Sequence, residues 1–111
     1  MMRTTALSVD QAGGTTAELV AAKAGYRIEV TSLFLTVENG ALGVNSTLQD
    51  GTANTVRMTL TSQAATSVVS YSCPGTPEAP LFETAVGESL ELVTGTAAIV
   101  AGLLNYRYTR D

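Results

Sequence analysis

The chain has 111 residues, which is the length of a single domain, and its formal net charge is −4. Its six Lys and Arg are scattered, so they cannot form the phosphate-neutralising stripe of a nucleic-acid-binding protein, and the acidity also disfavours anionic membrane surfaces. Charged residues make up 14% of the chain and aromatic residues 5%, whereas there are seventeen Thr. Because threonine is β-branched and favours strands, the composition predicts an all-β protein.

The N-terminal residues 1–25 are less regular than the rest of the chain. The stretch "RTTALSVD" is compatible with a short strand, "QAGG" breaks it, and the small residues of "TTAELVAAKAG" fit a helical turn or an extended arm. We interpret residues 1–25 as an N-terminal arm and residues 26–111 as a β-sandwich domain. The alternative is that the segment holds a first strand of the domain, followed by a loop.

A long strand begins at Tyr26, and its apolar positions change phase in the middle. Apolar residues occupy even positions up to Val30 and odd positions from Leu33 onward. A β-bulge at residues 31–32 produces such a switch, because one extra residue exchanges the two faces of a strand. The Asn39–Gly40 pair then predicts a turn.

Shorter strands follow at intervals of about 8–12 residues, separated by turn signals. Turns are predicted at Asp50–Gly51 and Val86–Gly87, and residues 74–80 form a stiff loop with three prolines. This spacing predicts an antiparallel β-sandwich, jelly-roll-like, with seven or eight strands. Alternation places five side chains of two of these strands toward the core: Val56, Met58, Leu60, Leu90 and Leu92.

The run Ala97–Leu104 is almost wholly apolar. Its eight residues are far fewer than the ~20 of a membrane-spanning helix, and it lacks the caps and the 3.6-residue stripe of a buried helix. We predict a central strand that is buried on both faces where its residues are small. Such a strand implies two sheets in a sandwich, or a sheet face that is closed by a neighbouring subunit. Since a single cysteine permits no internal disulfide, we also predict an oligomer, as a homotrimer.

Residues suited to catalysis or metal binding are scarce. The chain has no histidine and one cysteine, Cys73, which removes the usual general base, nucleophile activator and zinc ligands. Its carboxylates are interpreted as surface groups, and no calcium loop or nucleotide-binding glycine motif occurs. We predict no enzymatic activity and no catalytic, cofactor-binding or metal-binding residues. Tyr71, Tyr106 and Tyr108 are candidates for a sugar-binding face, although core packing is the favoured interpretation.

Two stretches, "AGYRIEVTSLFLTVENG" and "LFETAVGESLELVTGTAAIVAGLLNYRY", carry a family likeness. Over Ala22–Tyr108 the chain resembles small virion proteins of tailed bacteriophages, of the β-sandwich or jelly-roll type. The resemblance implies a capsid decoration (cement) protein that binds the outer surface of the phage head and stabilises it. Its most specific part is the series Phe82-Glu83-Thr84, Gly87-Glu88, Leu90, Leu92, Ala98, Val100, Gly102 and Tyr106.

The partners that this resemblance implies are the major capsid protein and the chain itself, as a homotrimer. It implies a non-enzymatic protein that is made in the host cytoplasm and located on the virion, at the capsid surface. The N-terminus lacks the continuous apolar run of a secretion signal, in keeping with that location. A second function stays open, namely a head-fibre or tail-associated binding module that contacts host glycan or protein.

Overall fold

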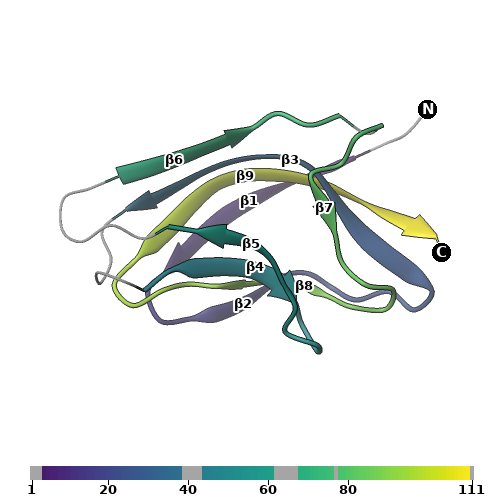
Figure 1. The fold of residues 1–111 in the computed structure, drawn as a ribbon, viewed down its shortest axis with the longest axis horizontal. Helices are drawn as coiled ribbons and strands as arrows, with labels where there is room; N and C mark the ends of the chain where they lie inside the picture. The colour runs from purple at the N-terminus through teal and green to yellow at the C-terminus, as the bar shows by residue number, and fades with distance from the viewer. Residues whose placement is uncertain (1–3, 39–43, 62–67, 77, 111) are drawn as a thin grey trace.

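A computed structural model describes residues 4–38, 44–61, 68–76 and 78–110, and within these residues the secondary structure consists of β-strands without helix (Figure 1). The strands form two antiparallel sheets that pack face to face, so the predicted all-β sandwich is confirmed. In chain order the strands are β1 (Thr5–Ala12), β2 (Thr16–Val20), β3 (Tyr26–Glu38), β4 (Ser46–Asp50), β5 (Val56–Leu60), β6 (Val68–Cys73), β7 (Phe82–Glu83), β8 (Leu90–Val93) and β9 (Ile99–Arg110).

The strand order is that of a jelly roll. One sheet has the order β1-β9-β3-β6, with the short β7 also paired to β3, and the other has the order β2-β8-β4-β5. The antiparallel pairs are therefore nested, since β1 pairs with β9, β2 with β8, β3 with β6 and β4 with β5. Nesting of this kind rolls a long hairpin into two four-stranded layers, the arrangement of jelly-roll domains. Figure 1 shows the two layers one above the other.

The predicted division into an arm and a domain at residue 25 does not hold for residues 5–20. β1 pairs with β9 over eight positions, from Thr5 to Ala12, and β2 pairs with β8 in the other sheet. Val9 and Val20 are buried among the core residues. The segment therefore contains strands of the sandwich, which is close to the alternative interpretation. Its pattern is weak because each of these strands buries only one apolar side chain fully, Val9 in β1 and Val20 in β2.

The core lies between the two sheets and takes buried apolar side chains from seven of the nine strands or their ends, while β6 and β7 add partly buried ones. Leu60, Leu90 and Leu92 point inward as the alternation predicts. The phase change predicted in β3 is also confirmed, because its register with β9 shifts between Val30 and Ser32. The buried apolar residues are Val9, Val20, Ile28, Val30, Leu33, Leu35, Val37, Leu48, Leu60, Leu90, Leu92, Ala98, Val100 and Leu104.

One inward-facing prediction is wrong. Val56 is half exposed, because a second bulge displaces it. Leu48 of β4 pairs with Met58 and the next residue, Gln49, pairs with Val56, so Arg57 is an extra residue in β5. The predicted turns after β4 and before β8 are present, and the predicted Asn39–Gly40 turn lies outside the described residues.

Candidate interaction surface

The sheet β1-β9-β3-β6 has one face on the core and one face outside. In β9, Val100 and Leu104 are fully buried, whereas Ile99 and Leu103 are 37% and 52% exposed. β9 is a central strand between β1 and β3, as predicted. The prediction that Ala97–Leu104 is buried on both faces is wrong for the single chain, because the sandwich supplies a second sheet on one side only.

Large apolar side chains gather on this outer face, in the half of the sheet where β3 pairs with β6. Strand register sets them in rows, since residues directly opposite in antiparallel strands share a face. Phe34, Val68 and Leu103 are each about half exposed. We call this surface the apolar half of the outer face, and its rows are Ser8–Leu103–Phe34–Ser72, Asp10–Ala101–Thr36–Ser70 and Ala12–Ile99–Glu38–Val68.

A shallow hollow of about 330 Å³ lies within the apolar half, beside Phe34. Ser70 and Ser72 of β6 line one side, and Ala101 and Gly102 of β9 line another. Gly102 has a φ of 145°, and a Cβ at this position would collide with the carbonyl oxygen of Phe34. Glycine therefore permits the close approach of β9 to β3 at the centre of this surface.

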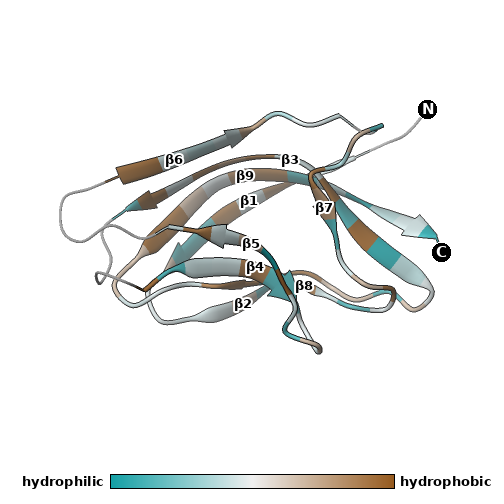
Figure 2. Ribbon diagram, viewed as in Figure 1, coloured by the Kyte–Doolittle hydropathy of each residue, from teal (hydrophilic) through white to brown (hydrophobic). Residues whose placement is uncertain are grey.

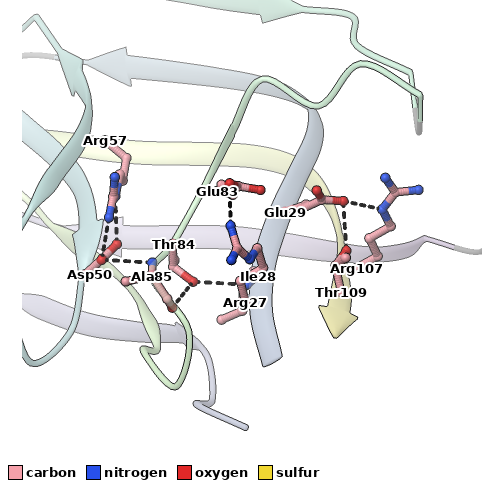
Figure 3. A network of polar contacts seen from close by, with 10 residues as sticks. All are labelled: Arg27, Ile28, Glu29, Asp50, Arg57, Glu83, Thr84, Ala85, Arg107 and Thr109. Atoms are coloured by element: carbon pink, nitrogen blue, oxygen red, sulfur yellow. Dashed lines mark hydrogen bonds and ion pairs between the residues drawn. The ribbon is translucent and has the colours of Figure 1, made fainter. Parts of the chain in front are cut away.

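Beyond the bulge in β3, the same outer face is charged. Arg107 Nε donates a hydrogen bond to Glu29 Oε1 at 2.6 Å and Thr109 Oγ1 donates to the same oxygen at 2.8 Å, while Arg27 pairs with Glu83 at 2.7 Å (Figure 3). Burial alone would raise the pKa of Glu29, but the hydrogen bonds from Thr109 and Arg107 and the Arg107 charge outweigh it. The pKa of Glu29 therefore lies below its ordinary value of 4.5.

This carboxylate predicts a stability loss in acid. Since the pKa of Glu29 is lower in the folded state, its ionised form stabilises the fold above about pH 4.5, and this contribution disappears as the pH falls through the folded-state pKa. We expect Glu29→Gln to unfold at lower urea concentration than the parent at pH 7 and to lose less stability between pH 5 and 3. Glu38→Gln, an exposed position of the same strand, serves as the control. Parallel pH profiles for all three proteins would contradict this expectation.

A second polar network ties the two sheets together. Asp50 is fully buried and accepts hydrogen bonds from Arg57 Nε at 3.0 Å, Arg57 Nη2 at 2.8 Å and the backbone N–H of Ala85 at 3.1 Å (Figure 3). The hydrogen bond to Asp50 is the main reason that the pKa of Arg57 is raised. Next to Ala85, the hydroxyl of Thr84 accepts from the N–H of Ile28 in β3. The charges are mutually compensated, so this network fits a structural role.

The tyrosines considered for sugar binding pack against the core, as the favoured interpretation predicts. Tyr106 and Tyr108 meet edge to face, with ring centroids 6.0 Å apart. The Tyr108 hydroxyl donates to the carbonyl oxygen of Ala21 at 2.6 Å, and the Tyr71 hydroxyl accepts from the N–H of Thr61. All three rings are partly buried against the core, and the hydroxyls of Tyr71 and Tyr108 are hydrogen-bonded, which fits packing better than an open sugar-binding platform.

We also searched the described part of the chain for a metal site, a reactive cysteine and a membrane-spanning helix. Within it, no three His, Cys, Asp or Glu side chains gather in a way that could hold a metal ion. Cys73 packs against the core. The described residues also include no helix long and apolar enough to cross a membrane.

Fold and surface together define a jelly-roll sandwich with an open, half-apolar sheet face. No protein-family model, curated protein or solved structure matches the chain. Sequence reasoning did not single out Phe34 and Leu103, the central pair of the surface. The signal was nevertheless present, because a bulge at residues 31–32 makes Leu33 and Leu35 the inward positions and leaves the apolar Phe34 pointing outward.

Proposed function

We propose that this chain is a non-enzymatic structural protein of a virion, a capsid decoration protein that binds the outer surface of a phage head and stabilises it. The observation that carries the proposal is the apolar half of the outer face. Four large apolar side chains, Phe34, Val68, Ile99 and Leu103, are exposed there on a rigid sheet. Contiguous exposed apolar patches mark interaction sites more often than free surface.

Two further observations support the proposal. Jelly rolls recur in viral capsid and lectin domains, although a fold alone does not specify a function. The likeness to small phage virion proteins covers most of the chain, and among these classes of jelly-roll protein it favours a virion protein. The major capsid protein is then the partner that covers the outer face, and the homotrimer that the resemblance implies stays a prediction.

The geometry suits docking without rearrangement. The apolar half is built on strands, and its remaining positions are Ala, Ser and Thr, apart from two carboxylates. Asp10 lies at the β1 end of its row, and Glu38 lies between Ile99 and Val68. A flat, preformed surface loses little conformational entropy on binding. A protein that binds the assembled capsid and not its separated subunits stabilises the assembly by mass action. A decoration protein therefore needs no catalytic activity to stabilise the head.

The proposal predicts a selective binding defect. We expect the double variant Phe34→Ser, Leu103→Ser to bind at least about tenfold more weakly to phage heads assembled without the protein, because it removes the central apolar contacts. Its melting temperature should stay near that of the parent, since both side chains are about half exposed. Co-sedimentation of purified protein with such heads measures the binding.

Val86→Ser is the matched control, because Val86 is also exposed but lies in the turn before β8, away from the outer face. Equal binding of the double variant and the control would contradict the proposal. Localisation of the protein on fibres or tails in a cryo-EM map of the particle would instead support the alternative, a module that contacts host glycan or protein.

A further inference from the structure

Apart from the two-residue β7, which also pairs only with β3, the sheets of the described part of the chain end in four edge strands, β1, β6, β2 and β5. β6 differs from the other three. β1 carries Asp10, β2 carries Glu18 and a bulge, and β5 carries Arg57 and a bulge. The six residues of β6, "VVSYSC", include no charge and no proline, and their register with β3 is unbroken. Edge strands are normally protected by charges, prolines or bulges, so β6 is an unprotected edge.

The free edge of β6 is also open among the described residues. β6 pairs only with β3, and Figure 1 shows it as the outermost strand of its layer. Figure 2 shows that β6 begins with a hydrophobic segment, which holds Val68 and Val69. Val68 is 56% exposed, and the hollow beside Phe34 adjoins the strand. An edge with free backbone N–H and C=O groups and apolar side chains is suited to pairing with another strand.

The charge distribution favours a second copy of this chain as the partner that pairs with the β6 edge. The protein is acidic, with a net charge of −4, and acidic residues lie on β1 and β2. Two copies that met through either of those edges would bring like charges together, which destabilises strand pairs. The Arg57 charge on β5 is already paired with Asp50. At β6, two copies bring together only Val, Ser, Tyr and Cys side chains.

We propose that two copies of the chain pair through their β6 edges, antiparallel and related by a two-fold axis. Identical edges form an isologous contact, so the product is a dimer with one continuous sheet across both copies. The outward residues Val68, Ser70 and Ser72 then extend the apolar half of each copy into that of its partner. Six residues a side make a small contact, so we expect the dimer to be weak and its population to depend on concentration.

Sedimentation velocity and light scattering across the micromolar range test the pairing. The expected mass rises from the 11.5 kDa of one chain to twice that value as the concentration increases. Ser70→Lys introduces a charge at an exposed position of β6 and should raise the dissociation constant at least about tenfold, since two lysines then face one another across the contact. Ser8→Lys makes the same charge change at an exposed position of β1, the opposite edge of the sheet, and should leave it unchanged.

Amide hydrogen exchange gives an independent readout. Protection of the β6 amides should increase with concentration in the parent protein and in Ser8→Lys, and not in Ser70→Lys. If Ser70→Lys does not fold, Ser72→Lys takes its place, because Ser72 is exposed on the same strand. A chain that stays monomeric throughout, or equal weakening by the β6 and β1 lysines, would overturn the proposal. A mass of three copies would also overturn it, in favour of the homotrimer that the resemblance implies. Because Ser70 and Ser72 also lie in the rows of the outer face, the pairing is measured in the absence of phage heads. Binding to heads is tested separately by the double variant Phe34→Ser, Leu103→Ser, in which neither position lies on β6.

Discussion

A chain that lacks residues 1–14 is expected to lose the cooperative unfolding transition of the full-length protein. The deletion removes β1, which pairs with β9 over eight positions and buries Val9 in the core. Burying a valine is worth about 1.5–3 kcal/mol, and β9 would in addition lose its hydrogen-bonded neighbour on one side. The total stability of a domain of this size is only about 5–15 kcal/mol, so the loss removes most of it.

Urea titration followed by circular dichroism measures this effect, with one-dimensional NMR as a check on side-chain packing. Deletion of residues 1–4 is the control, because it ends just before β1. The control should unfold with a free energy within about 1 kcal/mol of the parent. A chain without residues 1–14 that still unfolds in a sharp transition of normal midpoint would show that the segment is a dispensable arm.

Arg57→Ala is expected to lower the free energy of unfolding by about 3–5 kcal/mol, the usual effect of leaving a buried charge without its partner. The Asp50 side chain is completely inaccessible to solvent and receives two of its three hydrogen bonds from Arg57. The reverse change, Asp50→Ala, should cost less, because Arg57 is partly exposed and its charge can be hydrated.

The matched control for this prediction is Arg27→Ala. Its ion pair with Glu83 has a similar length, 2.7 Å against 2.8 Å, but Glu83 is 42% exposed. Exposed pairs contribute about 0–1 kcal/mol, so the control should lose little stability. Urea unfolding at pH 7 compares the two variants. Equal losses would indicate that burial of Asp50 does not set the energy of its ion pair.

The bulge in β3 connects the fold to the proposed function. Without the extra residue at positions 31–32, Phe34 would point into the core and Leu33 and Leu35 would point outward. The bulge also marks the boundary on the outer face between the charged pairs around Glu29 and the apolar half around Phe34. One register shift thus gives a single sheet two surfaces with different chemistry, of which only the apolar one is free for a partner of the kind proposed.

The sequence by itself determined the all-β class, the long bulged strand and the strands around Leu90 and Leu92. These features could be predicted because side chains of a strand alternate between two faces. The apolar pattern of consecutive residues therefore shows both the strand and any change of face within it. The turns before Val56 and after Val86 were readable for a similar reason, since turn residues act on the local backbone.

Only the tertiary structure decided which edges and faces are open. The arm became β1 and β2, because pairing with β9 and β8 depends on residues at least 70 positions away. Val56 turned outward through a bulge that exists only in the register of β5 with β4, and the Glu29–Arg107 ion pair joins residues 78 positions apart. The exposure of Leu103 was likewise invisible, because a run of apolar residues does not show whether one sheet or two will cover it. Local backbone preference fixes the strands, whereas burial and exposure follow from which strands meet.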